Sequence, residues 1–402
     1  MEGTLHNSTS HQLPCLKYWR SHTPSAQVYN NCQDPYRRPG YLYIDKDNYK
    51  DSRWIPYSSE FLDADIPDYA QYPVPAGQDV FFNVTKVESA ILDSTSVPPQ
   101  WMPSAVTEGQ RRRKAVSTGK TVEDFVGMKD DGDLGWLWGR RLLIFGDSVD
   151  RFMIQFFCEE FGWAMQQQGS HTTATCEVPT LNLTLIHWHF AGSWTSRPDW
   201  WWMDDMKEIP FEERWPKLWA PLLDTHVRGL NGMPDLVFWN NGLWDQRALW
   251  EAAEAHHKPD TILGQRERQL AWQELRFVGA RIQKLVQRIH DEFPGVPTMF
   301  RANTVHRDSS ARDASTLELD RLSRAIAERA GHEVFEWGRL VAAFSMLYKD
   351  NTHIDKGAGS WLWGDMVLES LARAAHVGDR ARAPYFDGWD ACHSRLVAWG
   401  GR

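Results

Sequence analysis

The chain has 402 residues, enough to bury a large hydrophobic core, so we expect one large domain or a domain with a substantial cap. Its formal net charge of −9 argues against a nucleic-acid partner, because such partners bind basic surfaces. No apolar run approaches the roughly 20 residues of a membrane-spanning helix. Residues 1–6 lack the basic and apolar regions of a signal peptide, and we expect no cofactor.

Residues 1–135 are predicted to form an irregular N-terminal cap region. They show no long periodic segment and are rich in Pro, Tyr, Asp and Asn. We expect short strands and loops that pack over the carboxyl edge of the catalytic sheet and add aromatic walls to its cleft. Residues 104–133 are charged and punctuated by glycine, which predicts a loop, and the basic run 111–114 within them is expected to be solvated.

Residues 136–402 have the regular pattern of a catalytic domain, in which buried strands alternate with amphipathic helices. This alternation predicts an α/β protein, a three-layer α/β/α sandwich around a parallel sheet. Ligands of such sheets bind beyond the carboxyl ends of the strands. The expected strands are 142–145, 184–190, 235–240, 298–303 and 333–337, and the expected helices are 151–163, 265–293, 317–329 and 361–375.

Two short motifs carry the chemistry. Ser148 follows the first buried strand and precedes a helix, so its hydroxyl is expected on a tight turn above a helix N-terminus, which stabilises a developing oxyanion. Asp350 and His353 lie about 200 positions downstream, near the end of the pattern. A serine hydroxyl becomes a nucleophile when a histidine takes its proton and a carboxylate orients that histidine. The alternatives are a helix-capping serine, a turn-forming aspartate and a loop histidine.

Residues 146–151, Gly-Asp-Ser-Val-Asp-Arg, resemble the first block of the SGNH, or GDSL, hydrolase superfamily. With Arg151 three places after the serine, the segment resembles more specifically that of the PC-esterase branch. This branch includes trichome-birefringence-like and fungal glycan O-acetyltransferases. The resemblance implies an SGNH-hydrolase-like fold with Ser148 as nucleophile, His353 as base and Asp350 as its partner. It also implies a secretory setting, in the Golgi lumen or outside the cell.

The same resemblance implies an oxyanion hole made of the backbone N–H of Ser148, Gly192 and the side-chain amide of Asn240. Residues 240–244, Asn-Asn-Gly-Leu-Trp, look like the Asn-Thr-Gly-His-Trp segment of the PC-esterase branch. The more general Gly-x-Asn-Asp pattern of the superfamily would place Trp244 where the amide belongs, so Asn241 is kept in reserve. Both asparagines also suit a turn before glycine.

Aromatic and basic residues are candidates for substrate binding. The 22 tryptophans suit both core packing and stacking on sugar rings, and the run 200–202 is expected in a loop. We predict substrate contacts from Arg151, Asn241, Trp194 and Trp201. His187 and His189 fall on one face of a strand. With a third ligand they could bind zinc, but ordinary sheet histidines are the favoured interpretation.

Five cysteines and three Asn-x-Ser/Thr sequons agree with a secreted glycoprotein. The expected bridges are Cys158–Cys176 and Cys15–Cys32, with Cys392 left over; the alternative is that all five are buried thiols. The sequons lie at Asn7, Asn83 and Asn182.

Together these features predict a serine-dependent enzyme that transfers an acetyl group to a glycan hydroxyl through an acetyl-serine intermediate. The expected partner is a glycan or another acylated small molecule. A carbohydrate acetylesterase of the same fold is the first alternative, and a non-catalytic carbohydrate-binding protein is the second.

Overall fold

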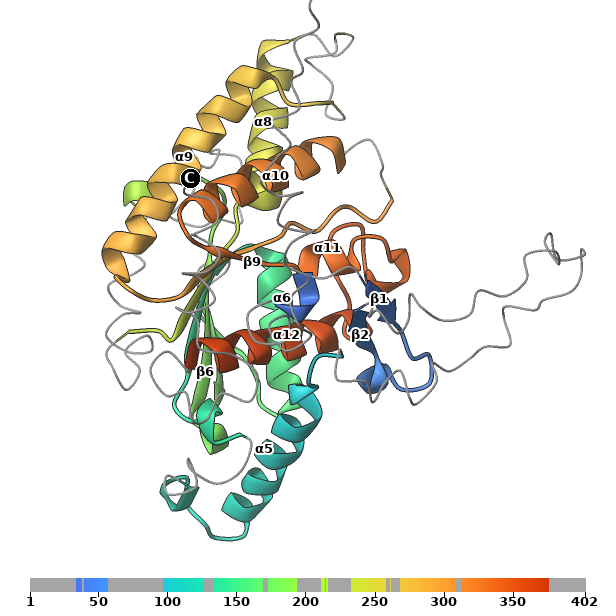
Figure 1. Cartoon of the computed structure of the whole chain (residues 1–402), viewed down its shortest axis with the longest axis vertical. Helices are drawn as coiled ribbons and strands as arrows, with labels where there is room; N and C mark the ends of the chain where they lie inside the picture. Colours follow the sequence, from blue (N-terminus) through green and yellow to red (C-terminus); the bar gives the residue numbers. More distant parts are fainter. Residues whose placement is uncertain are drawn as a thin grey trace, which may run out of the picture.

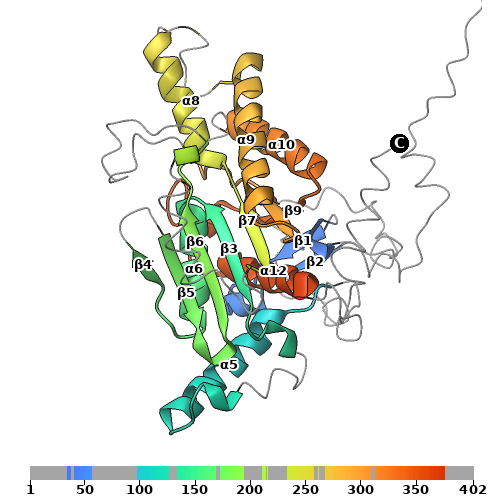
Figure 2. The ribbon, with the colours of Figure 1, turned by 90° about the vertical axis from the view of Figure 1, so that its left-hand side faces the viewer.

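The computed structural model describes residues 34–37, 40–56, 97–125, 134–168, 173–193, 211–213, 215, 233–257, 261, 268–308 and 313–375. Within them, seven strands form one sheet (Figure 1): β3 (Arg141–Gly146), β4 (Gln166–Gln168), β5 (Thr173–Val178), β6 (Leu183–His189), β7 (Leu236–Trp239), β8 (Thr298–Arg301) and β9 (Glu333–Phe335). Their order across the sheet is β4-β5-β6-β3-β7-β8-β9. Strands β6, β3, β7, β8 and β9 are parallel, and β4 and β5 add an antiparallel edge (Figure 2).

Helices cover both faces of this sheet. One layer contains α6 (Ser148–Glu160) and α12 (Ala358–Ala375), and the other contains α8 (Gly242–His256), α9 (Trp272–Glu292) and α10 (Asp313–Arg329). Alternate residues of β3 enter the two cores, because successive strand side chains point to opposite faces. Leu142 and Ile144 pack in the core that α6 and α12 share, and Leu143 and Phe145 pack in the core under α9. The predicted three-layer α/β/α sandwich is therefore confirmed.

Most predicted elements of the regular region are present close to their predicted ends. The long helix is shorter than predicted: α9 begins at Trp272 rather than at residue 265. The edge pair β4 and β5 and the helix α8 were not predicted. Strand β4 consists of three glutamines and so has no apolar alternation, and α8 has only a weak apolar face, whose buried side chains include Asp245 and Gln246.

The predicted loop at 104–133 is wrong over its first half, which forms the helix α5 (Trp101–Ser117). Its buried face includes small and charged residues, Gly109 and Arg112 among them, so the sequence shows little amphipathic pattern. The helix has no side-chain cap of its own. Instead, Asp365 of α12 accepts a hydrogen bond from the Met102 backbone N–H at 2.7 Å and so satisfies a free donor of the first turn.

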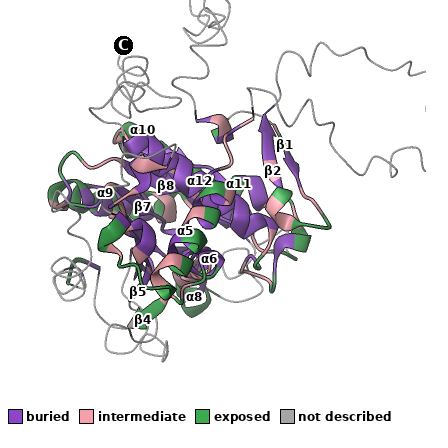
Figure 3. Cartoon of the chain, turned by 90° about the horizontal axis from the view of Figure 1, so that it is seen from below, coloured by how far each residue is buried: buried purple, intermediate pink, exposed green. Residues whose placement is uncertain are grey.

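The described part of the N-terminal region packs on α12 and α6, whereas we predicted a cap over the carboxyl edge of the sheet. It contains α5, the hairpin of β1 (Gly40–Tyr43) and β2 (Arg53–Pro56), and the short helix η2 (Tyr49–Asp51). Tyr49 contacts the ring of Trp361 on α12 and donates to Glu160 on α6 at 2.6 Å. Because these elements cover its outer face, α12 is buried from residue 358 to 374 (Figure 3).

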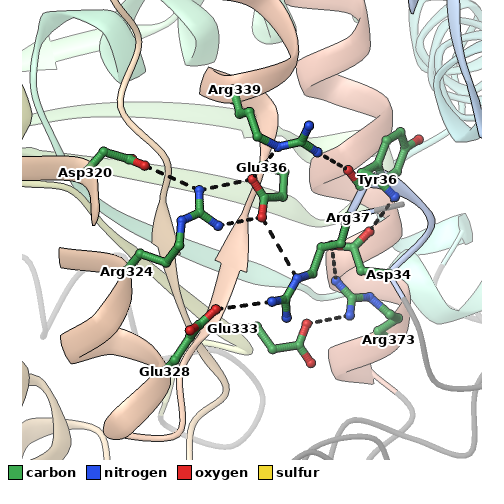
Figure 4. A network of polar contacts seen from close by, with 10 residues as sticks. All are labelled: Asp34, Tyr36, Arg37, Asp320, Arg324, Glu328, Glu333, Glu336, Arg339 and Arg373. Atoms are coloured by element: carbon green, nitrogen blue, oxygen red, sulfur yellow. Dashed lines mark hydrogen bonds and ion pairs between the residues drawn. The ribbon is translucent and has the colours of Figure 1, made fainter. Parts of the chain in front are cut away.

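Charged side chains tie residues 34–37 to the far edge of the sheet. Arg373 of α12 bonds Glu333 of β9 at 2.6 Å and Asp34 at 3.4 Å, with all three side chains buried. Arg37 pairs with Glu328 at 3.2 Å. Figure 4 shows how these contacts continue into a second group around Glu336: Asp320, Arg324 and Arg339.

The structure also bears on the predictions about cysteines, sequons and membrane-spanning helices. Cys158 and Cys176 form the predicted disulfide, with their Cα atoms 5.6 Å apart. Asn182 lies in a left-handed turn, and its side-chain oxygen accepts from Arg141 at 2.9 Å. Among the described helices, none has the length and apolarity needed to cross a membrane. The other cysteines and sequons lie outside the described residues: Cys15, Cys32, Cys392, Asn7 and Asn83.

The junction between α5 and α12 predicts a pH dependence of stability. Glu369 of α12 accepts from the Trp101 indole N–H at 2.6 Å, and burial raises the pKa of Glu369 from an ordinary value of 4.5 to about 7. Between pH 4.5 and pH 7 the folded protein keeps a proton on Glu369 that the unfolded chain has released. The free energy of unfolding of the wild type therefore falls as the pH rises through this range. Glu369→Gln keeps an acceptor but cannot ionise. We expect its free energy of unfolding to rise relative to the wild type between pH 5 and pH 8, measured by urea denaturation.

The exposed Glu123 provides the matched control. Glu123→Gln should show a nearly constant difference from the wild type over the same pH range. A constant difference for Glu369→Gln as well would contradict the prediction.

Candidate active site

The turn that carries Ser148 is built by a capping box. Asp147 is the N-cap of α6: its carboxylate accepts from the Val149 backbone N–H at 2.9 Å, and Asp150 accepts from the Asp147 backbone N–H at 3.3 Å. Gly146 is required because a Cβ there would fall on the Asp150 carboxylate. Since Asp147 is the cap, Ser148 is the first residue of the helix, and its hydroxyl is not the helix-capping group.

The structure brings Ser148, His353 and Asp350 together. The Ser148 Oγ lies 2.8 Å from the His353 Nε2, and the His353 Nδ1 lies 2.8 Å and 3.0 Å from the two Asp350 carboxylate oxygens. A carboxylate can only accept, so the neutral ring carries its proton on Nδ1 and presents a lone pair at Nε2. In this tautomer the serine hydroxyl donates to the histidine, which is the arrangement needed to remove its proton.

Asp350 also organises the loop that carries the histidine. One of its oxygens accepts the backbone N–H groups of Thr352 at 2.7 Å and His353 at 2.8 Å. Desolvation alone would raise the pKa of Asp350, but these hydrogen bonds and the imidazole outweigh it and lower the pKa. The loop is fixed from outside by the Arg307 N–H, which donates to the Asn351 carbonyl at 2.9 Å. Asp350 therefore fills both roles considered from the sequence: it forms the turn, and it contacts the His353 ring.

A buried ion pair lies beneath the serine turn. Arg301, at the end of β8, donates two hydrogen bonds to Asp150, at 2.8 Å and 2.7 Å, and approaches Asp147 at 3.5 Å. All three side chains are almost completely buried. Burial raises the pKa of Asp147, while the Arg301 charge opposes that rise. Nothing in the local sequence marks Arg301, because its partners are about 150 positions away.

His187 anchors the same turn from the neighbouring strand. Its Nε2 lies 3.1 Å from the Gly146 carbonyl and 3.0 Å from the Asp147 carbonyl, so this nitrogen carries the proton and donates. Burial lowers the pKa of His187 to about 4, which keeps the ring neutral near pH 7. The ring of His189 lies 5.9 Å away, and no group of three or more possible metal ligands occurs in the described part of the chain. The favoured interpretation of His187 as an ordinary sheet histidine thus fits its contacts.

Asn240, predicted to donate its side-chain amide to an oxyanion, is engaged elsewhere. Its Nδ2 donates to the Arg301 carbonyl at 2.8 Å and to the Asn303 Oδ1 at 2.5 Å, and an amide nitrogen has two hydrogens. Its Oδ1 accepts from the Gly242 N–H at 2.9 Å. As placed, Asn240 has no amide hydrogen left for an oxyanion. It acts instead as a turn residue, the alternative considered for it from the sequence.

The side-chain oxygen of the reserve donor Asn241 is bound to another element. Its Oδ1 accepts from the Ser323 hydroxyl of α10 at 2.8 Å, so its side chain is directed towards the opposite helical layer. Its Nδ2 is buried without a partner in the described residues, so the contact of Asn241 with a substrate stays a prediction. Apart from this reserve donor, the oxyanion donors that stay predictions are backbone groups, at Ser148 and Gly192.

Gly192 lies just beyond β6 and has a φ of 83°, in the left-handed region that favours glycine. A Cβ at this position would come within 2.5 Å of the Asp245 carboxylate. The same carboxylate accepts from the Ser193 backbone N–H at 2.7 Å. Asp245 thereby holds the loop after β6 close to the start of α8.

The predicted substrate contacts are only partly described. Arg151 lies on the first turn of α6, half-buried, and donates to the Gln167 side chain at 3.3 Å. Trp194 and Trp201 lie outside the described residues, as does the whole run 200–202. Among the other clustered tryptophans, Trp136, Trp361 and Trp363 are buried, as core packing predicts.

Comparison with known proteins gives distant structural similarities. No family model matches the chain, and no curated protein does. A GDSL-like lipase from Parabacteroides merdae is 14% identical, with a TM-score of 0.34, over 58% of this chain and 96% of its own. An acetylxylan esterase from Geobacillus stearothermophilus is 12% identical, with a TM-score of 0.33, over 58% of this chain and 94% of its own. A lipase/acylhydrolase from Enterococcus faecalis is 11% identical, with a TM-score of 0.32, over 58% and 95%. These similarities are too distant to assign an activity.

The Arg301–Asp150 pair predicts a large cost for removing the cation. Arg301→Met leaves two buried aspartates without their counter-ion, and breaking a buried pair in this way costs about 3–5 kcal/mol. We expect a loss of that size in the free energy of unfolding, measured by urea denaturation at neutral pH. Arg111→Met is the control, since Arg111 pairs with Glu108 on the surface, where such pairs contribute about 1 kcal/mol or less. Equal losses in the two variants would show that the buried pair does not support the turn.

Proposed function

We propose that this protein is a serine-dependent acyl enzyme that acts on acetyl esters of glycans through an acetyl-serine intermediate. The observation that carries the proposal is the continuous hydrogen-bonded series from Ser148 through His353 to Asp350, with both contacts at 2.8 Å. If Ser148 only capped a helix and His353 were only a loop residue, nothing would require hydrogen bonds between two loops about 200 residues apart.

The chemistry follows from the direction of these bonds. The Ser148 Oγ attacks the acetyl carbonyl while its proton moves to the His353 Nε2, and Asp350 stabilises the imidazolium. Collapse of the tetrahedral intermediate breaks the ester bond, and the departing alcohol oxygen takes that proton. An acceptor hydroxyl then gives its proton to Nε2 and attacks the acetyl-serine, which releases the acetylated acceptor and restores Ser148. The backbone N–H groups proposed as oxyanion donors are those of Ser148 and Gly192.

The acceptor decides between a transferase and an esterase. The sequence resemblance favours a glycan hydroxyl as acceptor. The exposure of the site favours water: the Asp350 side chain is 49% exposed and that of His353 is 22% exposed, and transfer requires that water be kept from the acyl-enzyme. Hydrolysis of a carbohydrate acetyl ester is therefore the second candidate function for the same residues.

A secretory location is proposed on the same footing. The sequence resemblance implies it, and the Cys158–Cys176 disulfide supports it, because structural disulfides persist mainly in oxidising compartments.

Replacement of the nucleophile tests the proposal directly. Ser148→Ala removes the atom that carries the acetyl group, so both acetyl release from p-nitrophenyl acetate and transfer to an added oligosaccharide should be abolished. Mass spectrometry of a quenched wild-type reaction should show one acetyl group on the peptide that contains Ser148. Wild-type turnover by Ser148→Ala would refute the mechanism. If both proteins are inert and bind oligosaccharide equally, the chain is a carbohydrate-binding protein.

Replacement of the orienting carboxylate tests the order of the three residues. Asp350→Asn preserves size, but its amide nitrogen faces the ring or the loop N–H groups, so the required tautomer is lost; in a serine protease the equivalent change lowers kcat by about 10⁴. We expect a loss of about 10²–10⁴ in kcat for the acetyl ester. The loss in the double variant with His353→Ala should be far from the product of the two single losses, because the three groups act as a unit. Multiplicative losses would separate Asp350 from the histidine.

A further inference from the structure

Phe152 lies one helical turn beyond Ser148 and joins the candidate triad to the surface. Its ring meets the ring of His353 edge-on, with the centroids 4.9 Å apart and the planes at 75°. The Phe152 side chain is half-buried, so part of it faces outward beside the base. The ring is therefore a partly exposed surface next to the proposed base.

Two cations gather on the same ring. The Lys349 Nζ lies 3.1 Å from the centre of Phe152, and the Arg151 guanidinium carbon lies 5.1 Å from it. Both distances are within the range of cation–π attraction, which runs to about 6 Å. Lys349 is also tied to the base, because its backbone N–H donates to the His353 carbonyl at 2.9 Å. The backbone of Lys349 is thus tied to that of His353, while its ammonium group lies on the Phe152 ring.

Neither cation is neutralised by an ion pair in the described part of the chain. Arg151 donates there only to the neutral side chain of Gln167, and its Nε is buried without a partner. The acids that act on Lys349 are Asp350, which is engaged by His353, and Asp355. Desolvation lowers the pKa of Lys349, and the nearby charge of Arg151 lowers it further. Two poorly compensated cations at one point are notable in a chain with a net charge of −9.

We propose that Arg151 and Lys349 bind an anionic group on the substrate, so that the enzyme selects acetyl esters of acidic glycan units. This inference rests on the proposed function, since it places the anion beside the ester that Ser148 attacks. Arg151 has the planar fork that pairs with a carboxylate or a sulfate, and Lys349 adds a point charge. The Arg151 Nε is buried, so the anion would be bound by the terminal N–H groups of the guanidinium. The proposed ligand is one anionic group with negatively charged oxygens, either a carboxylate or a sulfate.

The experiment compares acetyl esters that differ in one charge. The substrates are an acetylated methyl glucuronide, its neutral methyl ester and an acetylated sulfated methyl glucoside. We expect the wild type to prefer at least one anionic substrate over the neutral ester by about tenfold or more in kcat/KM, with the difference mainly in KM. The preference should shrink between 20 mM and 500 mM NaCl, because partly exposed charges are screened by salt.

The variants assign the preference to the two residues. Arg151→Gln should reduce the ratio of anionic to neutral kcat/KM about tenfold, as expected for a hydrogen bond to a charged group. Lys349→Gln should reduce it about threefold, as expected for a more exposed charge. Lys120→Gln removes one positive charge from an exposed position on the turn after α5 and should leave the ratio unchanged. An equal reduction in Lys120→Gln would mean that the effect is one of net charge and would overturn the inference.

The outcomes also separate this inference from the proposed function. If the wild type cleaves the neutral and both anionic esters equally well, the anion site is refuted while the acyl-enzyme proposal stands. If it cleaves none and Ser148 is never acetylated, the proposed function fails. Calorimetric titration with unacetylated methyl glucuronide and with sulfated methyl glucoside then decides on the anion site. Binding that Arg151→Gln weakens and Lys120→Gln does not would support the site, and absence of binding would overturn it.

Discussion

The buried ion pair between Arg301 and Asp150 is the interaction on which the candidate site depends. Removing two charges from water is expensive, and the attraction between them repays that cost only with good geometry and further hydrogen bonds. Both conditions are met: the guanidinium is bidentate on Asp150, and its remaining group donates to the Ala302 carbonyl at 3.1 Å. Because Asp150 also closes the capping box on Asp147, the pair links the end of β8 to the turn after β3.

Strand β7 is also linked to Arg301. Strand β7 lies between β3 and β8, and Asn240 at its end donates to the Arg301 carbonyl. Three neighbouring strand ends are therefore joined by one arginine residue, through its side chain on one side and its backbone on the other. This explains why Asn240 contributes to the site by fixing the turn, where the sequence resemblance had suggested a direct contact with the reacting oxygen.

The distance between serine and histidine is set by a second constraint, the packing of α6 against α12. Ser148 begins α6, and His353 lies just before α12, so the two helices of one layer carry the two groups. Lys356, just before α12, connects the two helices by an ion pair with Glu159 in the last turn of α6, at 3.0 Å. On its outer face α12 presents Asp365 and Glu369 to α5. The described part of the N-terminal region thus supports the base by covering the helix that follows it.

What the sequence could predict depended on whether the signal was local. The turn at Ser148 and the motif of Asp350 and His353 are local patterns, and the apolar run of β3 announces a buried strand, so these could be located. Helix α5 could not, because its cap is Asp365, 263 positions away, and its buried face includes Arg112. Arg301 was missed for the same reason, since a lone arginine at a strand end shows its role only when the fold brings Asp150 beside it.

The charges around Phe152 bear on the chemistry as well as on recognition. When His353 takes the serine proton, a positive charge forms on a ring that contacts Phe152, the same ring on which Lys349 and Arg151 lie. Under the proposed mechanism, repulsion from the two cations would oppose that step, whereas Asp350 would favour it. An anionic substrate bound by the two cations would neutralise much of the repulsion before proton transfer begins. Under the proposed function, the acidic group would therefore help to form the imidazolium as well as hold the ester, and the selectivity for acidic glycans would appear in part in kcat.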